Sequence, residues 1–86
     1  MKIKDGFILR QVAGQNVVLP MGEDLNLNMM ITLNETGAFL WENLQEETDA
    51  EALTTALLGE YEVDAATARA AVDGFLAKLR AHEFLV

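Results

Sequence analysis

The spacing of apolar residues changes once along this chain, from a period of two to a period of about 3.6 near residue 33. Before this point, residues 7–13 and 16–20 are rich in β-branched and large apolar side chains, and apolar and polar residues largely alternate over residues 25–32. Alternation is typical of a strand with one buried face. After this point, apolar residues recur at helical spacing. The sequence therefore predicts strands followed by helices.

Three strands are expected in the first third of the chain. A turn at Gly14–Asn16 separates the first two and predicts a hairpin, and Pro20 with Gly22 ends the second strand. The third strand is expected over Leu25–Thr32. Its exposed face carries asparagines, which are poor strand formers, so we expect this strand at an edge of the sheet.

Three helices are expected in the remainder: residues 35–44 after the N-cap Asn34, a second helix from Thr48 or Asp49 to Gly59 or Glu60, and Ala65–Ala81 after the N-cap Asp64. The first helix is apolar on a wide face and contains Gly37, which predicts a close approach of the strand or of another helix. The order β-β-β-α-α-α with short loops predicts one α+β domain over residues 1–86.

Missing residue types exclude several kinds of chemistry. The chain has no cysteine and no serine, which excludes disulfides, thiolate catalysis, cysteine-based metal sites, a serine nucleophile and a serine-linked pantetheine arm. Its single histidine, His82, is too few for a histidine metal site. We therefore expect no enzyme activity, no metal and no cofactor.

The charge balance limits the partners. Fourteen acidic residues against six basic ones give a net charge of −8, which argues against nucleic acid and against an anionic membrane surface. The chain has no apolar run of about 18 residues, and its first residues lack the apolar segment of a signal peptide. A cytoplasmic protein is expected.

The stretch LNETGAFLWENL, directly after the third strand, resembles the PqqD-like family, whose members are also called RiPP recognition elements. The acidic segment TDAEALTTALLGEYEVD and the final ARAAVDGFLAKLRAHEFLV extend the resemblance over nearly the whole chain. The resemblance implies a winged-helix-like fold without enzyme activity. It also implies binding of the leader segment of a ribosomally made precursor peptide, which is then presented to a modifying enzyme, often a radical SAM enzyme.

In this family the leader adds as an extra strand on the third strand, beside the third helix, which agrees with an edge strand that can accept a partner. Mapped onto this chain, the docking strand is Leu25 to Ile31, and the third helix supplies the wall. The predicted peptide-binding residues are Leu25, Leu27, Asn28, Met29, Met30 and Ile31 on the strand and Arg69, Val72, Asp73, Phe75, Leu76, Leu79 and Arg80 on the helix.

The plainer interpretation of the third helix is core packing. Val72, Phe75, Leu76 and Leu79 form one apolar stripe, with Phe75 and Leu79 mostly in the core. The groove wall would then come from the margins of the stripe, such as Arg69, Asp73, Lys78 and Arg80. Other functions also fit parts of the sequence. The edge strand could pair with its own copy in a homodimer, and the acidic residues around the second helix could dock a basic enzyme. A winged-helix DNA binder is disfavoured by charge.

Overall fold

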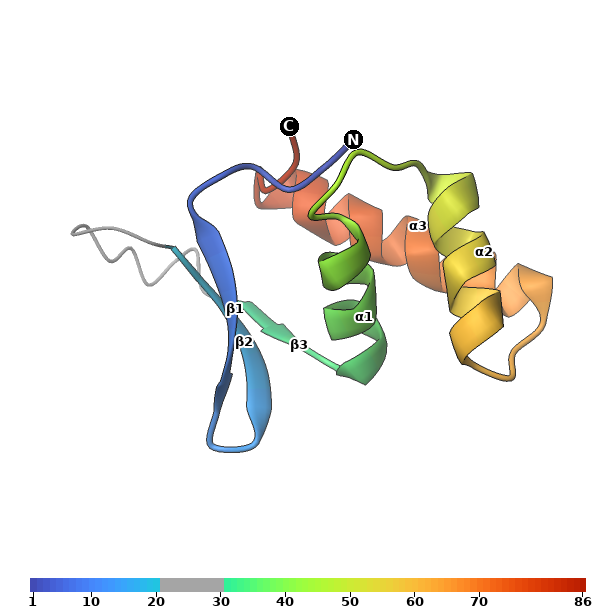
Figure 1. Cartoon of the computed structure of the whole chain (residues 1–86), viewed down its shortest axis with the longest axis horizontal. Coiled ribbons are helices and arrows are strands. Elements are labelled where there is room, and N and C mark those ends of the chain that lie inside the picture. The colour runs from blue at the N-terminus through green and yellow to red at the C-terminus, as the bar shows by residue number, and fades with distance from the viewer. Residues whose placement is uncertain (21–30) are drawn as a thin grey trace.

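The computed structural model describes residues 1–20 and 31–86, and in these residues the chain forms strands and then helices (Figure 1). The elements are β1 (Phe7–Val12), β2 (Gln15–Pro20), β3 (Ile31–Leu33), α1 (Glu35–Asn43), α2 (Ala50–Glu60) and α3 (Ala65–Ala81). This order confirms the predicted α+β class, with three antiparallel strands before three helices. Of the predicted third strand, residues 25–30 lie outside the described residues, and β3 continues one residue further than expected, to Leu33.

The strands pair in the order β1-β2-β3. In the β1–β2 hairpin Val12 pairs with Gln15, so only Ala13 and Gly14 form the turn, and both have positive φ, at 53° and 79°. Two left-handed residues are typical of a type I′ turn, which matches the twist of the strands. The turn predicted at Gly14–Asn16 was therefore wrong, because nothing in the sequence marks an alanine that adopts the left-handed conformation.

Each helix begins at an N-cap whose side chain accepts a hydrogen bond from the backbone. Asn34 accepts from Gly37 N at 2.7 Å, Asp49 from Ala52 N at 2.8 Å and Asp64 from Thr67 N at 2.7 Å. These contacts satisfy donors that the first turn of a helix otherwise leaves unpaired. They confirm the predicted caps and select Asp49 over Thr48 for α2.

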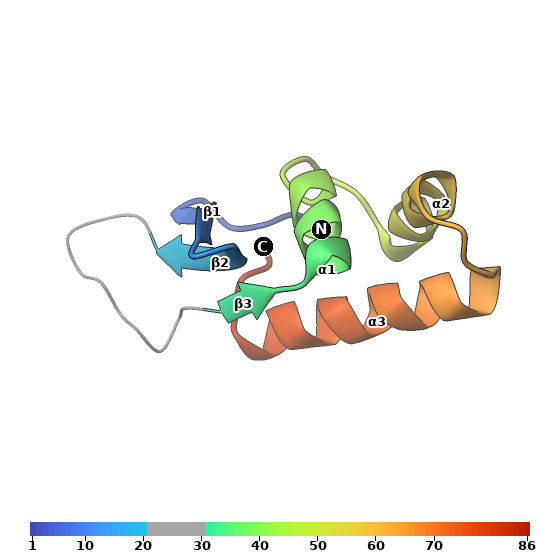
Figure 2. The same ribbon diagram turned by 90° about the horizontal axis from the view of Figure 1, so that it is seen from below.

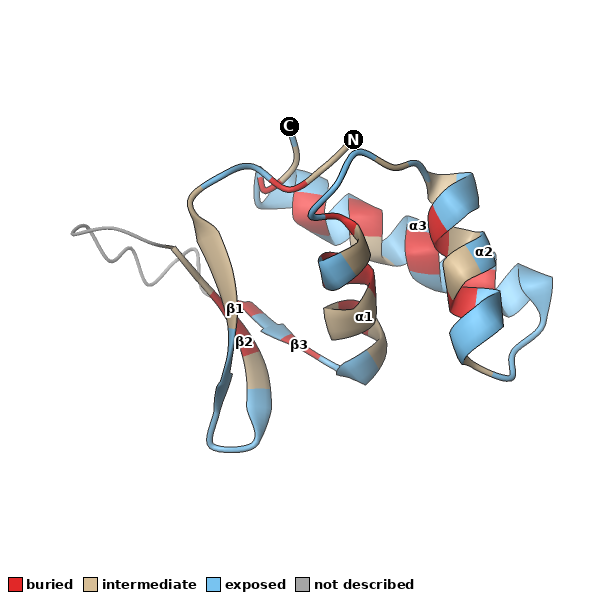
Figure 3. Cartoon of the chain, viewed as in Figure 1, coloured by how far each residue is buried: buried red, intermediate tan, exposed pale blue. Residues whose placement is uncertain are grey.

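Helix α3 runs beneath β3, α1 and α2 and supplies much of the core (Figure 2). Its buried residues are Ala68, Val72, Leu76 and Leu79, which recur at the spacing of one helix face (Figure 3). The core also includes Trp41 and Phe84, whose rings meet edge to face at 5.9 Å. Trp41 is thus a core residue, as its apolar helix indicated.

The two ends of the chain pair with each other at the carboxyl end of α1. Ile3 N donates to Leu44 O at 2.9 Å, and Ile3 forms an antiparallel bridge with Leu85. Phe84 is fully buried, which confirms that the apolar tail packs back on the domain, although Val86 remains exposed. None of the helices in the described residues has the length and apolar character needed to cross a lipid bilayer.

Helix α3 ends in a Schellman motif. Phe84 N donates to Leu79 O at 2.9 Å and Glu83 N donates to Arg80 O at 3.0 Å, while Glu83 has a φ of 59°. This position favours glycine, because a side chain in the left-handed region meets its own backbone. Glu83 therefore lowers the stability of this helix end. Burial of Phe84 holds the end in place despite this strain.

Replacing Glu83 with glycine should raise the free energy of unfolding by about 1 kcal/mol, because glycine adopts this conformation without strain. Urea denaturation of the two proteins measures the difference. Glu62→Gly is the matched control: it removes the same charge from an exposed residue whose φ is not positive, and it should lower stability slightly. Equal effects of the two substitutions would contradict the assignment of strain to Glu83.

Acid should weaken the start of α3. Hydrogen bonds from the backbone N–H and then the side chain of Thr67 lower the pKa of Asp64 below its ordinary value. The stabilisation from this carboxylate is therefore present above a pH of about 4 and is lost as the pH falls through the lowered value. Asp64→Asn keeps a capping side chain that does not titrate. The stability difference between wild type and Asp64→Asn should shrink on acidification, and a constant difference would contradict the lowered pKa.

Candidate groove beside the edge strand

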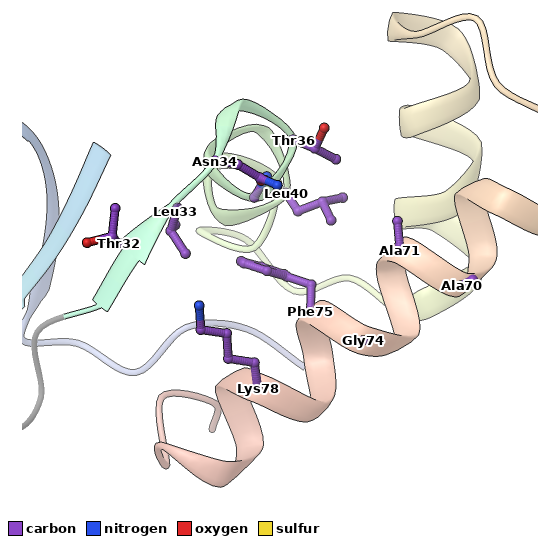
Figure 4. A pocket seen from close by; sticks show the side chains of 11 residues that line it. Thr32, Leu33, Asn34, Thr36, Leu40, Ala70, Ala71, Gly74, Phe75 and Lys78 are labelled. Carbon is purple, nitrogen blue, oxygen red and sulfur yellow. The ribbon is translucent and has the colours of Figure 1, made fainter. Parts of the chain in front are cut away.

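A groove of about 540 Å³ lies between α3 on one side and β3 with the start of α1 on the other. Figure 4 shows the side chains that converge on it. The lining residues are Thr32, Leu33, Asn34, Thr36, Gly37, Leu40, Ala70, Ala71, Gly74, Phe75 and Lys78. We call this the β3–α3 groove.

The strand edge at this groove has no partner among the described residues. Strand β2 pairs with β3 through Asn16–Leu33, Val17–Thr32 and Val18–Ile31, and α3 lies on the other side of β3 (Figure 4). Residues of an antiparallel strand alternate between pairing with one neighbour and with the other. Either Thr32 alone or Ile31 and Leu33 therefore direct their backbone N–H and C=O groups toward the groove. The predicted edge position of the third strand is confirmed for this segment.

Gly37 sets how closely α1 approaches the groove wall. A Cβ atom at this residue would lie 3.1 Å from Asn34 Oδ1, 3.3 Å from Leu33 Cβ and 3.3 Å from Phe75 Cε1. Contacts this short would push the neighbouring atoms away. The predicted close approach at Gly37 is thus confirmed, and it holds the Phe75 ring against the start of α1.

Lys78 gives the groove its only charged lining residue among the described residues. Its side chain projects from α3 toward β3 in Figure 4, and the other lining residues are apolar, small or uncharged polar ones. A single cation here contrasts with the acidic protein around it, which has a net charge of −8. Lys78 can therefore pair with a carboxylate of a ligand in the groove.

The predicted docking strand falls mostly outside the described residues, which include neither Leu25 nor Leu27, Asn28, Met29 or Met30. Ile31 is described, and it is buried in the hydrophobic core. Whether these residues pair with a peptide stays a prediction.

The predicted apolar wall residues of α3 separate by depth. Val72, Leu76 and Leu79 are buried in the core, and only Phe75, half-buried at the margin of the stripe, lines the groove. This matches the plainer interpretation for Leu79, which packs in the core, but not for Phe75, and the margin residues Arg69, Asp73 and Arg80 do not line the groove. Lys78 is such a margin residue and does line the groove.

The predicted charged wall residues lie outside the groove lining. Arg69 Nε donates to Asp73 Oδ1 at 3.0 Å in an exposed ion pair one turn apart, and Arg80 Nη2 lies 3.9 Å from Met1 Sδ. An exposed pair of this kind contributes little to stability. A part for Arg69, Asp73 and Arg80 in peptide binding stays a prediction.

Sequence reasoning missed the small residues of the wall. Ala70, Ala71 and Gly74 line the groove and leave its space open because they have little or no side chain. Their signal was positional: Ala70, Gly74 and Lys78 follow each other at four-residue spacing, the separation that places residues on one helix face.

The fold and the groove define a small α+β binding module, in which a sheet edge lies open beside a helix. The family model for coenzyme PQQ synthesis protein D (PqqD) matches residues 8–85, and the chain belongs to this family. The match confirms the resemblance found in the sequence.

A solved structure similar to this chain is TbiB1 in complex with the TbiA(beta) leader peptide. The two chains are 27% identical, with a TM-score of 0.76, and the alignment covers 99% of this chain and 94% of TbiB1. Among curated proteins no significant match was found.

Gly37→Val should cost about 1–3 kcal/mol of stability, because the added methyl groups overpack the contact with Phe75 and Leu33. Gly59→Val is the control: Gly59 also lies in a helix, but nothing lies within 4 Å of an added Cβ, so its effect should be small. Thermal denaturation compares the two. Similar losses at both sites would show that Gly37 is not a packing constraint.

Proposed function

We propose that this chain is a non-catalytic RiPP recognition element that binds the leader segment of a ribosomally synthesised precursor peptide. The leader adds as a strand to the open edge of β3, lies in the β3–α3 groove, and is held there for a modifying enzyme, such as a radical SAM enzyme. The open β3 edge beside this groove is the observation that carries the proposal. Membership of the PqqD family and the similarity to TbiB1, solved with a leader peptide, support it.

Strand addition suits what the groove offers. Backbone hydrogen bonds to a free edge contribute affinity with any sequence, while side-chain contacts beside the edge contribute selectivity. Among the described residues this edge comprises Ile31–Leu33, and the apolar Phe75 and the small residues of α3 face the added strand. Much of the selectivity should therefore come from α3.

A synthetic leader from the precursor encoded beside this chain's gene should bind with micromolar affinity or better, measured by calorimetry. Amide exchange at Ile31–Leu33 should slow on binding, and chemical shifts should change along the groove-lining face of α3. Gly74→Trp should weaken binding about tenfold or more, because the indole fills open space on the wall. Gly59→Trp places the same ring on α2, outside the groove lining, and should leave affinity unchanged.

Other outcomes would assign other roles. Shift changes confined to the acidic residues near Asp49 and Glu51 would contradict leader binding at β3 and favour an enzyme-docking adaptor. A mass that doubles with concentration, together with protection of the β3 amides in the absence of peptide, would favour a homodimer paired through this edge.

A further inference from the structure

A second, smaller pocket adjoins the β3–α3 groove where α2 meets α3. Its volume is about 180 Å³, and its walls include Leu57, Tyr61 and Val63 at the end of α2, with Thr67 and Ala68 on α3. It shares Thr36 and Ala71 with the groove. The two hollows are thus neighbours along α3.

The lining of this pocket is mostly apolar and carries no charged side chain, and its polar groups are the hydroxyls of Thr36, Tyr61 and Thr67. Val63 is 40% exposed, and the half-buried Tyr61 ring stacks edge to face on Phe39 at 5.8 Å. Partial burial, and then the negative charges of Glu35 and Glu60, raise the pKa of the Tyr61 phenol, so this wall stays neutral. A cavity of about 150 Å³ lined by apolar side chains can hold a benzene ring. The pocket therefore has room for one large apolar side chain.

The distance from this pocket to Lys78 sets how many residues of a bound peptide would separate the two contacts. With a rise of about 1.5 Å per residue, Lys78 lies about 10 Å along α3 from Ala71 and about 16 Å from Thr67. An extended peptide covers about 3.3 Å per residue, so this interval corresponds to about three to five residues. Only an even separation places two strand side chains on the same face, which selects four.

We propose that the pocket is a second subsite for the peptide bound at β3, and that it takes a large aliphatic or aromatic side chain of that peptide. Lys78 pairs with a carboxylate four residues away on the same face of the added strand. The inference rests on the proposed function and specifies its ligand: a peptide with one acidic and one large apolar residue in this spacing. The shared border with the groove at Thr36 and Ala71, and the charge of Lys78 in an otherwise uncharged lining, argue for this occupant.

A library of random 12-residue peptides, selected on the full chain, tests the spacing. Selected peptides should share an acidic and a large apolar residue four positions apart. Replacing either residue of a selected peptide with alanine should weaken binding about tenfold, the factor expected for one lost buried or charge-paired contact. Groove-binding peptides without this pair would overturn the inference and leave the proposed function standing.

Two matched pairs of variants, measured by calorimetry with one selected peptide, test the residues. Val63→Asp should weaken binding about tenfold, while Leu58→Asp, at an equally exposed residue outside the pocket, should not. Lys78→Glu should weaken binding, and replacing the peptide's acidic residue with lysine should restore it. Lys4→Glu, outside both hollows, should leave affinity unchanged.

The outcomes separate the two proposals. Unchanged affinity of Val63→Asp, with shift changes still present along β3, would remove the second subsite only. If no library peptide and no leader shifts the resonances of β3 or α3, both proposals fail. Circular dichroism tests whether each variant is folded. Because Val63 and Lys78 are exposed, substitutions at these residues should not unfold the domain.

Discussion

The structure depends on the burial of one face of α3. Ala68, Val72, Leu76 and Leu79 pack beneath the sheet and the other two helices, and this contact fixes the rotation of α3 about its own axis. Residues about one-third of a turn away, such as Ala71 and Lys78, then face the β3–α3 groove. Because core and wall share one rigid helix, a small rotation of α3 would disturb both at once. The same contacts that bury the core face of α3 therefore position the α3 wall of the groove.

The other wall is fixed by how little chain separates β3 from α1. Asn34 alone lies between Leu33 and Glu35, and it caps the helix through Gly37 N. The missing side chain at Gly37 lets this junction approach Phe75. The open strand edge and the start of α1 therefore keep one position relative to α3. Such a preformed surface loses little conformational entropy when a peptide is ordered on it.

Periodicity and capping chemistry predicted the helices well. Asn34, Asp49 and Asp64 mark helix starts because short polar side chains satisfy backbone donors, and the spacing of Val72, Leu76 and Leu79 identifies a buried face. The groove wall was harder to find. Ala70, Ala71 and Gly74 contribute to the groove because their side chains are small or missing and leave space open. A pattern of hydrophobic residues in the sequence does not reveal such positions. The turn was misplaced because Ala13 has positive φ, a conformation imposed by the hairpin register and not by its own preference. Charged residues at the margins of the stripe were assigned to the wall by position alone. The rotation of α3 about its axis decides that Lys78 lines the groove and Arg80 does not.

The pairing of the two chain ends has a consequence for covalent architecture. Ile3 and Leu85 meet at the carboxyl end of α1, beside Leu44, whereas the groove lies at the amino end of that helix (Figure 1). A linker or a fused enzyme domain attached to either end would emerge from the same place and leave the groove unobstructed. Joining the ends and opening the chain at the exposed β1–β2 turn, which lines neither hollow, would give a circular permutant with the same recognition surface. Neither fusion at an end nor permutation would therefore block access to the β3–α3 groove.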